Sequence, residues 1–176
     1  MRDLHTCKRI LVVGAGGAGK STFAVQLAER TGLPLIHLDC EYWQPGWVST
    51  PEAEWTARVQ QLVGGERWVM DGNYGGTIHL RVPHADAIVF FDLPRLVCIW
   101  GAIKRVVLQR VQPRYGLAAG CKDRVSLEFL SWIWNFRTKG RPRILGAIEN
   151  AAPGALVIRV TSRAQARTLL DAAIPQ

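Results

Sequence analysis

The sequence predicts a three-layer α/β domain built on a five-stranded parallel sheet, and three observations support that prediction. Short apolar runs of strand length alternate with segments of helical periodicity, which is the pattern of strand–helix–strand units. The first apolar run, Ile10–Val13, leads into a glycine-rich turn that ends in Lys20 and Ser21. Two later runs end in an aspartate, Asp39 and Asp71, as expected where the carboxyl ends of parallel strands face a ligand.

The composition suits one domain that spans residues 1–176, because 48% of the residues are hydrophobic and only 20% are charged. The longest apolar run, residues 96–103, is too short to span a membrane, and residues 1–9 lack the apolar region of a signal peptide. We therefore expect a cytoplasmic protein that has no membrane partner. The four cysteines include no C-x-x-C pair, so we expect reduced thiols rather than a zinc site or disulfides.

The glycine-rich turn matches the phosphate-binding loop pattern, in which a glycine, four residues and Gly-Lys-Ser follow a strand. In this pattern backbone N–H groups hold phosphates, the lysine reaches them, and the hydroxyl binds Mg²⁺. The same glycines also fit the dinucleotide pattern Gly-x-Gly-x-x-Gly, but the Lys-Ser pair favours ATP, because a dinucleotide pyrophosphate needs neither a lysine nor a metal. We therefore predict ATP and Mg²⁺ as cofactors, and the predicted nucleotide-binding residues are Gly14, Gly16, Gly17, Ala18, Gly19, Lys20, Ser21 and Thr22.

The segments after the loop alternate between helix and strand. Residues 20–31 carry apolar side chains at helical spacing and precede Gly32, so they predict the helix that presents the loop. Residues 35–39 predict a buried strand with Asp39 at its tip. The segment 40–50 is too irregular to predict a regular element, and its tryptophans either join the core or line an acceptor pocket.

A helix and two more strands complete the middle of the chain. Residues 50–63 predict a helix with Thr50 as its N-cap, because a proline and two acids occupy its first turn. Residues 67–71 and 85–92 predict two further apolar strands, and the first of them ends in Asp71 just before a glycine. The crevice at the strand ends therefore gains a second carboxylate.

The last third of the chain is mainly helical. Residues 95–111 predict one long amphipathic helix, because apolar residues recur every three or four positions. Residues 112–122 predict a loop, since they contain a proline and two glycines. Residues 126–136 are apolar almost all round, which predicts a buried helix that Gly-Arg-Pro at 140–142 breaks before a short helix to about residue 150. The chain closes with a predicted fifth strand and a predicted helix capped by Ser162, at residues 156–160 and 162–173.

The net charge of +8 is concentrated in residues 104–143, which hold ten basic and two acidic residues. Such a segment fits an anion-gripping lid, a nucleic-acid surface or a solvated face. We expect the part at about 112–124 to be a lid over the phosphates, and no nucleic-acid reading motif is evident, so DNA is the less favoured partner. DNA binding stays open for the basic residues beyond the lid, which are Arg137, Lys139, Arg141 and Arg143.

Several segments together resemble the adenylate-kinase-like P-loop proteins, and more narrowly the DNA topology modulation proteins among them. The resemblance covers nearly the whole chain and rests on the phosphate loop, Ile36-His37-Leu38-Asp39, Trp43-Gln44-Pro45-Gly46-Trp47, Asp71-Gly72-Asn73-Tyr74, and the helix end with Lys104, Arg105 and Arg110. Because many NTPases share the phosphate loop, the Asp-Gly-Asn-Tyr and tryptophan-rich segments carry the narrower resemblance. It implies the strand order 2-3-1-4-5 and a short kinase-like lid.

The predicted acceptor region, at about 40–66, departs from adenylate kinases. It contains only Arg58, where those enzymes carry several arginines for a nucleoside monophosphate. A resemblance to shikimate and gluconate kinases, which place an acid at the tip of the second strand, makes a small hydroxyl compound comparably plausible. The predicted function is therefore an ATP-dependent kinase acting on a nucleotide, a nucleoside or a hydroxyl compound. The alternative is a nucleotide-binding, DNA-associated protein that affects DNA topology with little or no kinase activity.

The acidic residues at the strand tips receive the metal and acceptor roles. Ser21 and Asp71 are the predicted Mg²⁺ ligands, and Asp92 is a weaker acidic candidate. Asp39 is predicted to bind the acceptor or to act as its general base.

The basic residues receive the phosphoryl-transfer roles. Lys20 and three lid arginines, Arg110, Arg114 and Arg124, are predicted to stabilise the transferred phosphoryl group. The family resemblance implies that Arg105 instead stacks on the adenine of ATP.

Overall fold

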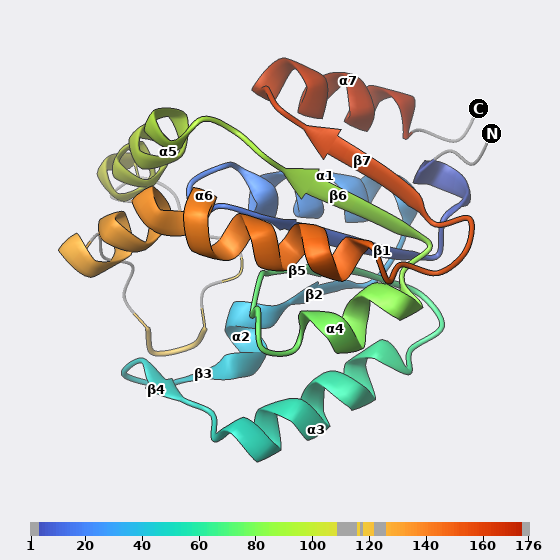
Figure 1. The fold of residues 1–176 in the computed structure, drawn as a ribbon, viewed down its shortest axis with the longest axis horizontal. Coiled ribbons are helices and arrows are strands. Elements are labelled where there is room, and N and C mark those ends of the chain that lie inside the picture. Colours follow the sequence, from blue (N-terminus) through green and yellow to red (C-terminus); the bar gives the residue numbers. More distant parts are fainter. Residues whose placement is uncertain (1–3, 109–115, 117, 122–125, 174–176) are drawn as a thin grey trace.

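A five-stranded parallel sheet forms the centre of the computed structural model, which describes residues 4–108, 116, 118–121 and 126–173. The strand order is β2-β5-β1-β6-β7 (Figure 1). With these strands numbered 1 to 5 along the chain, this is the predicted order 2-3-1-4-5. The strands are β1 (Arg9–Gly14), β2 (Leu35–His37), β5 (Trp68–Asp71), β6 (Ala87–Phe91) and β7 (Leu156–Val160).

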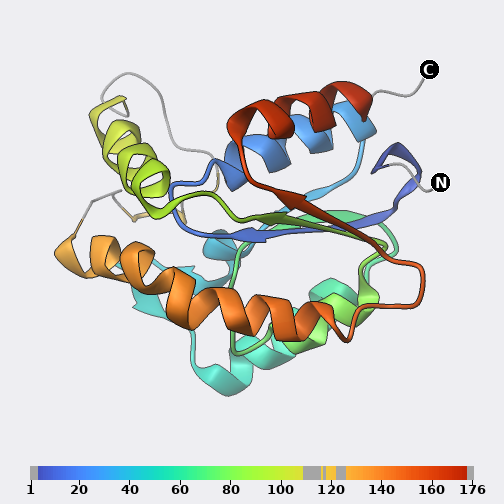
Figure 2. The same ribbon diagram turned by 45° about the horizontal axis from the view of Figure 1, so that its top comes forward.

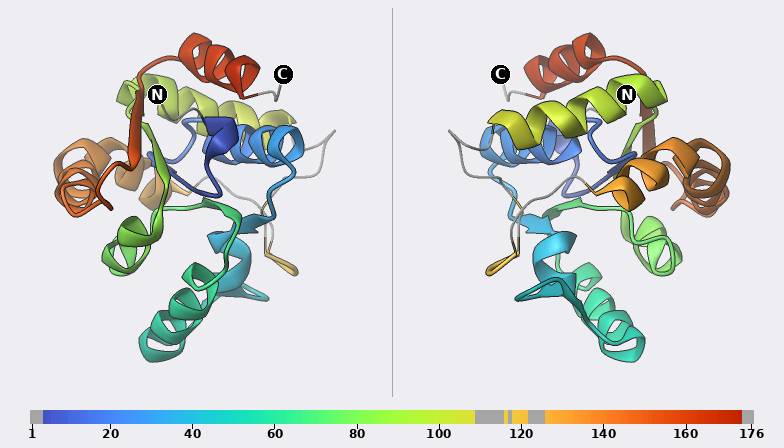
Figure 3. Two further views of the ribbon diagram at one scale, coloured as in Figure 1. Left: turned by 90° about the vertical axis from the view of Figure 1, so that its right-hand side faces the viewer. Right: turned by 90° about the vertical axis from the view of Figure 1, so that its left-hand side faces the viewer.

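Helices cover both faces of the sheet, which confirms the three-layer prediction (Figure 2). One face carries α1 (Lys20–Thr31) and α7 (Arg163–Ala172), which contact each other. The other face carries α3 (Glu52–Val63), α4 (Ile78–Arg81) and α6 (Leu127–Ile148). A further helix, α5 (Arg95–Leu108), packs against α6 beside the carboxyl ends of the strands (Figure 3). Two short 3-10 helices, Leu4–Thr6 and Val82–His84, lie before β1 and after α4.

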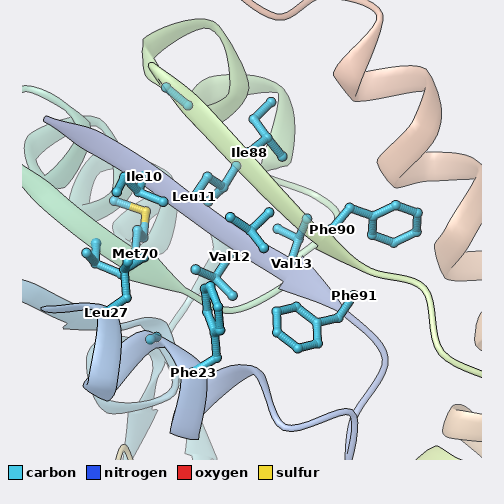
Figure 4. Close-up of a cluster of buried hydrophobic side chains, with 14 of the residues drawn as sticks. Ile10, Leu11, Val12, Val13, Phe23, Leu27, Met70, Ile88, Phe90 and Phe91 are labelled. Carbon is cyan, nitrogen blue, oxygen red and sulfur yellow. The ribbon is translucent and has the colours of Figure 1, made fainter. Parts of the chain in front are cut away.

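The core is densest around β1, the central strand. Its residues from Ile10 to Val13 have no exposed surface, because helices cover both faces of a parallel sheet. Phe23 and Leu27 of α1 pack onto this strand (Figure 4), and the Phe23 ring meets the Phe91 ring edge-on at 5.2 Å. The loop that follows β1 therefore starts from a rigid position.

The strand register brings the carboxyl ends together at one edge of the sheet. Asp71, the last residue of β5, lies beside Val12 of β1 and beside His37 of β2. Gly14, the last residue of β1, lies beside Phe91 of β6. The glycine-rich loop and the Asp71 carboxylate are thus neighbours because of the sheet alone.

The segment after β2 differs from the sequence prediction in two ways. The strand ends at His37, so Asp39 lies in a short helix, α2 (Leu38–Tyr42), rather than at a strand tip. The segment predicted to be irregular forms a two-stranded hairpin of β3 (Trp43–Gln44) and β4 (Val48–Ser49). Packing of aromatic rings explains both differences, because Tyr42 meets three other rings of this region at 4.7–5.1 Å.

Helix α3 begins at Glu52, close to its predicted start, but its predicted cap was wrong. The Thr50 hydroxyl does not cap the helix and instead donates a hydrogen bond to the Tyr42 carbonyl oxygen at 2.5 Å. The threonine therefore fixes the end of the hairpin. In contrast, the Ser162 cap of α7 was predicted correctly, because its hydroxyl oxygen accepts from the Gln165 N–H at 3.2 Å.

Helix α6 is continuous where the sequence predicted a break, with Pro142 inside it. Ile133 and Phe136 before the proline and Ile144 after it are all buried, so both halves of the helix pack against the rest of the protein. Gly140 leaves room for the Phe136 ring, since a Cβ atom there would lie 2.5 Å from it. Packing thus outweighs the local cost of a proline, which is about 3 kcal/mol.

Burial on α5 and α6 also differs from the prediction. Residues 126–136 are not buried all round, because Leu127, Trp132 and Trp134 are 85%, 43% and 48% exposed. The predicted apolar stripe of α5 also faces outward, with Leu96, Trp100, Ile103 and Val107 exposed. The small residues Cys98 and Ala102 face inward instead, because the glycine-rich loop approaches α5 too closely for larger side chains. Among the described residues, no helix is long and apolar enough to cross a membrane.

Candidate active site

The loop between β1 and α1 has a backbone that only glycine tolerates at two positions. Gly14 and Gly17 have φ angles of 141° and 74°. A Cβ atom would lie 2.3 Å from the Phe91 carbonyl oxygen at the first position and 2.0 Å from the Cys98 carbonyl oxygen at the second. The loop is therefore held tightly against the ends of β6 and α5. This is the geometry in which backbone N–H groups and a helix N-terminus can hold an anion.

Lys20 lies over this loop. Its Nζ donates a hydrogen bond to the Ala15 carbonyl oxygen at 2.9 Å. Burial lowers the pKa of Lys20, and the negative charges of Asp71 and Asp39 oppose that effect. The ammonium group thus lies near two carboxylates at the position where phosphates would bind.

A cavity of about 1180 Å³ opens at the carboxyl edge of the sheet. It brings together most of the predicted site residues, although they come from four different parts of the chain. Gly14 does not line the cavity, but its backbone conformation sets the start of the loop. The predicted site residues that do line it are Gly16, Gly17, Ala18, Gly19, Lys20, Ser21, Thr22, Asp39, Asp71 and Arg105.

Asp71 has the properties of a metal-binding carboxylate. It is 6% exposed, its Oδ2 lies 3.2 Å from His37 Nδ1, and its Oδ1 is buried without a hydrogen-bond partner. Burial alone would raise the pKa of Asp71, but hydrogen bonds from His37 and Ser21 and the charge of Lys20 outweigh it and lower the pKa. The carboxylate therefore stays ionised, with one oxygen available to a cation.

These residues fit Mg²⁺. This ion is usually held by one or two carboxylates, a hydroxyl and phosphate oxygens, and it keeps several waters. The Ser21 hydroxyl lies close enough to Asp71 to lower its pKa, and both residues line the cavity, so the hydroxyl and the carboxylate lie near each other. No group of three or more His, Cys, Asp or Glu side chains gathers within the described ranges, so an all-protein metal cage is not formed there.

Asn73 connects the turn after β5 to the phosphate loop, a role that sequence reasoning missed. Its Oδ1 accepts from the Gly14 N–H at 2.8 Å, and its Nδ2 donates to the Gly14 carbonyl oxygen at 2.5 Å. The side chain therefore replaces a strand partner for the first residue of the loop. Its position two residues after Asp71 was the available signal.

Arg81 stabilises the same turn from inside the protein and was also missed. Its side chain has no exposed surface and donates hydrogen bonds to the carbonyl oxygens of Gly72 at 2.9 Å, Tyr74 at 3.0 Å and Asn73. Burial lowers the pKa of Arg81 to about 9, which leaves the guanidinium protonated at neutral pH. An arginine within the short apolar stretch 78–82 was the signal in the sequence.

Asp39 lines the cavity from within α2. Its Oδ1 accepts a hydrogen bond from the Tyr74 hydroxyl at 2.8 Å. Trp43 and Trp47 line the same cavity, with their ring centroids 5.4 Å apart. Of the two interpretations that the sequence left open for these tryptophans, the structure favours the pocket wall.

The described part of the predicted lid touches the hairpin that carries these tryptophans. The Gly120 carbonyl oxygen accepts from the Gly46 N–H at 3.4 Å, and the Cys121 thiol donates to the Gln44 carbonyl oxygen at 3.4 Å. The rest of the segment 112–124 falls outside the described residues, as does the predicted end of the helix 95–111. The predicted lid arginines Arg110, Arg114 and Arg124 also lie outside the described residues.

Arg105, at the end of α5, lines the cavity. Its guanidinium carbon lies 5.7 Å from the centre of the Phe129 ring. It therefore borders the space next to the phosphate loop, and its role toward adenine stays a prediction.

Asp92, the weaker acidic candidate, is an ion-pair residue. Its Oδ2 lies 3.0 Å from Arg141 Nε and 2.6 Å from Arg159 Nη2. It therefore ties α6 and β7 to the end of β6, and it does not line the cavity. Arg141 is held in the fold by this ion pair, and Arg143 lines the cavity. Two of the four basic residues considered for DNA binding therefore have places in the fold or the site.

Comparison with known proteins agrees with this architecture. A family model described as isopentenyl transferase matches residues 7–42, which contain β1, the phosphate loop, α1, β2 and α2. This match covers a small part of the chain. No curated protein sequence matches the chain significantly.

Solved structures of small kinases superpose over nearly the full length. Shikimate kinase from Acinetobacter baumannii in complex with shikimate is 17% identical, covers 96% of this chain and 91% of its own, and has a TM-score of 0.62. Shikimate kinase from Bacteroides thetaiotaomicron is 16% identical, covers 94% and 96%, and has a TM-score of 0.59. A gluconokinase from Sinorhizobium meliloti is 16% identical, covers 98% and 91%, and has a TM-score of 0.52. The chain therefore has the fold of the small P-loop kinases, whereas the narrower resemblance to DNA topology modulation proteins gains no support.

Proposed function

We propose that the protein is an ATP-dependent kinase that transfers the γ-phosphoryl group of ATP to a hydroxyl group of a small molecule. One observation carries this proposal: a single cavity joins the phosphate loop, with Lys20 and Ser21, to two carboxylates, Asp71 and Asp39. In this proposal the first carboxylate binds the metal and the second binds the acceptor. The fold shared with shikimate kinases and a gluconokinase supports the same reaction class.

ATP would bind with its phosphates on the loop between Gly14 and Ser21. Ser21 and Asp71 would hold Mg²⁺, which supplies charge neutralisation for the β- and γ-phosphates when it is bound. Lys20 would contact the phosphate oxygens from the same side, since its Nζ already lies over the loop. Arg105 would lie against adenine at the cavity wall next to α5.

The negative charge of Asp39 determines which kind of acceptor we expect. A carboxylate at the acceptor position repels an incoming phosphate but accepts the proton of a hydroxyl group. In the reaction the acceptor oxygen forms a bond to the γ-phosphorus, the bond from that phosphorus to the bridging oxygen of ADP breaks, and the hydroxyl proton passes to Asp39. Among the acceptors predicted from the sequence, a hydroxyl compound or a nucleoside is therefore favoured over a nucleotide phosphate.

A panel of acceptors tests the proposal. ADP release would be measured with ATP and Mg²⁺ in the presence of nucleosides, nucleoside monophosphates, sugars and hydroxy acids, including shikimate and gluconate. We expect at least one hydroxyl compound to raise ADP release, and we expect Asp39→Asn to remove that stimulation while ATP affinity changes little. If no member of the panel raises ADP release, the kinase proposal fails.

The metal assignment has its own test. Asp71→Asn removes the ionised oxygen but keeps the shape, so we expect Mg²⁺ affinity to fall much more than the affinity for nucleotide without metal. Titration calorimetry with and without Mg²⁺ measures both. Equal losses would mean that Asp71 is only a structural partner of His37.

The lid arginines complete the proposal. We infer that at least one of Arg110, Arg114 and Arg124 contacts the transferred phosphoryl group. An arginine in that role is worth about a thousandfold in rate. Its change to Ala should lower turnover at saturating substrates by more than about tenfold with a smaller change in ATP affinity. Arg105→Ala should instead weaken ATP binding. Unchanged turnover in all three lid variants would mean that the lid arginines do not take part in phosphoryl transfer.

A further inference from the structure

Tyr74 has an unusual backbone conformation at the wall of the cavity. Tyr74 and Trp47 are the non-glycine residues with positive φ among the described residues, at 38° and 65°, and both line the cavity. A bulky residue rarely adopts this region without other interactions that hold it there. The Tyr74 carbonyl oxygen accepts hydrogen bonds from Arg81 Nη2 and from the Thr77 N–H, both at 3.0 Å.

The Tyr74 side chain contacts Asp39. Its hydroxyl donates to Asp39 Oδ1 at 2.8 Å, and the Trp43 side chain also interacts with this hydroxyl. The indole N–H of Trp43 can only donate, so this interaction leaves the tyrosine proton for the bond to Asp39. Burial and the Asp39 charge raise the pKa of Tyr74, so the hydroxyl remains a donor at every working pH.

We propose that Tyr74 is the positioning residue for Asp39: by binding one carboxylate oxygen it fixes the rotation of the carboxyl group, so that the base faces the acceptor hydroxyl in each turnover. This role rests on the proposed kinase function. Nothing in the reaction requires Tyr74 to touch the acceptor. Its contribution therefore acts entirely through Asp39.

Tyr42 provides a matched control within the same aromatic cluster. Its ring centroid lies 4.7 Å from that of Tyr74, and both rings pack on Trp55. Tyr42 does not line the cavity, whereas the Tyr74 hydroxyl donates the hydrogen bond to Asp39 Oδ1. Removing its hydroxyl therefore perturbs the cluster to a similar degree without changing the carboxylate.

A double-mutant cycle on ATP hydrolysis tests the proposal, with water as the phosphoryl acceptor so that no other acceptor is needed. The water oxygen bonds to the γ-phosphorus, ADP leaves, and the water proton passes to Asp39 and then to solvent. We expect Tyr74→Phe to lower kcat about tenfold with the KM for ATP within about twofold, since a positioned base contributes about a hundredfold or more. Tyr42→Phe should leave kcat unchanged. In an Asp39→Asn background, Tyr74→Phe should have no further effect.

The results distinguish a failure of the proposed function from a failure of the positioning role. If the wild-type protein releases no ADP from ATP with water or with any member of the acceptor panel, the proposed function is wrong and the positioning role fails with it. If ADP is released only with an acceptor, the same cycle is measured with that acceptor. If the wild-type protein hydrolyses ATP and Tyr74→Phe leaves kcat unchanged, or lowers it equally in the Asp39→Asn background, only the positioning role is wrong.

A second variant covers the case in which Tyr74→Phe does not fold. Trp43→Phe keeps an aromatic ring but removes the indole N–H that interacts with the Tyr74 hydroxyl, so it should lower kcat about threefold in the same Asp39-dependent way. No change in kcat would then contradict the proposal.

Discussion

Arg81 offers the sharpest test of how this fold builds its site, because one buried side chain holds the whole turn between Asp71 and Tyr74. Arg81→Met keeps the length and apolar volume of the side chain and removes the guanidinium. The carbonyl oxygens of Gly72 and Asn73 then lose the Arg81 donor, and that of Tyr74 keeps only its bonds from Thr77. These carbonyls are only partly buried, so each lost bond costs about 1 kcal/mol, the typical net value for a hydrogen bond rather than the larger value for a buried charged donor.

The three bonds together predict a loss of about 3 kcal/mol in the free energy of unfolding, or a Tm lower by about 6 to 12 °C for a chain of this size. Urea unfolding followed by circular dichroism measures the first quantity, and thermal unfolding the second. Arg30→Met is the control, because Arg30 forms an exposed pair with Asp171 at 3.1 Å, which is worth at most about 1 kcal/mol. If Arg81→Met costs no more than the control, the guanidinium does not hold the turn.

Three further predictions concern the loop and the thiols. Lys20→Ala should abolish ATP turnover while the Tm stays within a few degrees, because the side chain contributes charge to the loop rather than packing; Lys139→Ala, on the exposed face of α6, should leave turnover unchanged. Asn73→Ala should weaken ATP binding about tenfold in titration calorimetry, since the two bonds to Gly14 are lost; unchanged affinity would mean that the loop keeps its shape unaided. Iodoacetamide at pH 8 should label Cys40 first in the native protein, because the other three thiols are buried and burial raises the pKa of Cys98; mass spectrometry that finds equal labelling would contradict this order.

The sequence by itself determined the elements whose signals are local. The helix Lys20–Thr31 has the predicted bounds, because helical spacing, the preceding glycines and Gly32 all lie within a few residues of its ends. The five strands were also predictable, since a buried parallel strand is a short continuous apolar run. The phosphate loop needs no distant partner for its recognition, because its glycines and lysine are consecutive.

Tertiary packing alone decided which faces of the later helices are buried. Periodicity shows that α5 has an apolar stripe, but it cannot show that the loop at Gly17 will occupy the space next to Cys98 and Ala102. In the same way, a proline at position 142 argues locally for a break, and only the burial of residues on both sides of it keeps α6 continuous.

The site depended on packing for the same reason. Asp39 was correctly selected as a crevice residue, but its partner Tyr74 lies 35 positions away, and the link between Gly14 and Asn73 spans 59 positions. Such pairs leave no periodic or compositional signal, because each residue looks like an ordinary turn residue within its own segment. Their contacts arise only when β5 inserts between β1 and β2, which brings the turn after Asp71 against both the phosphate loop and α2.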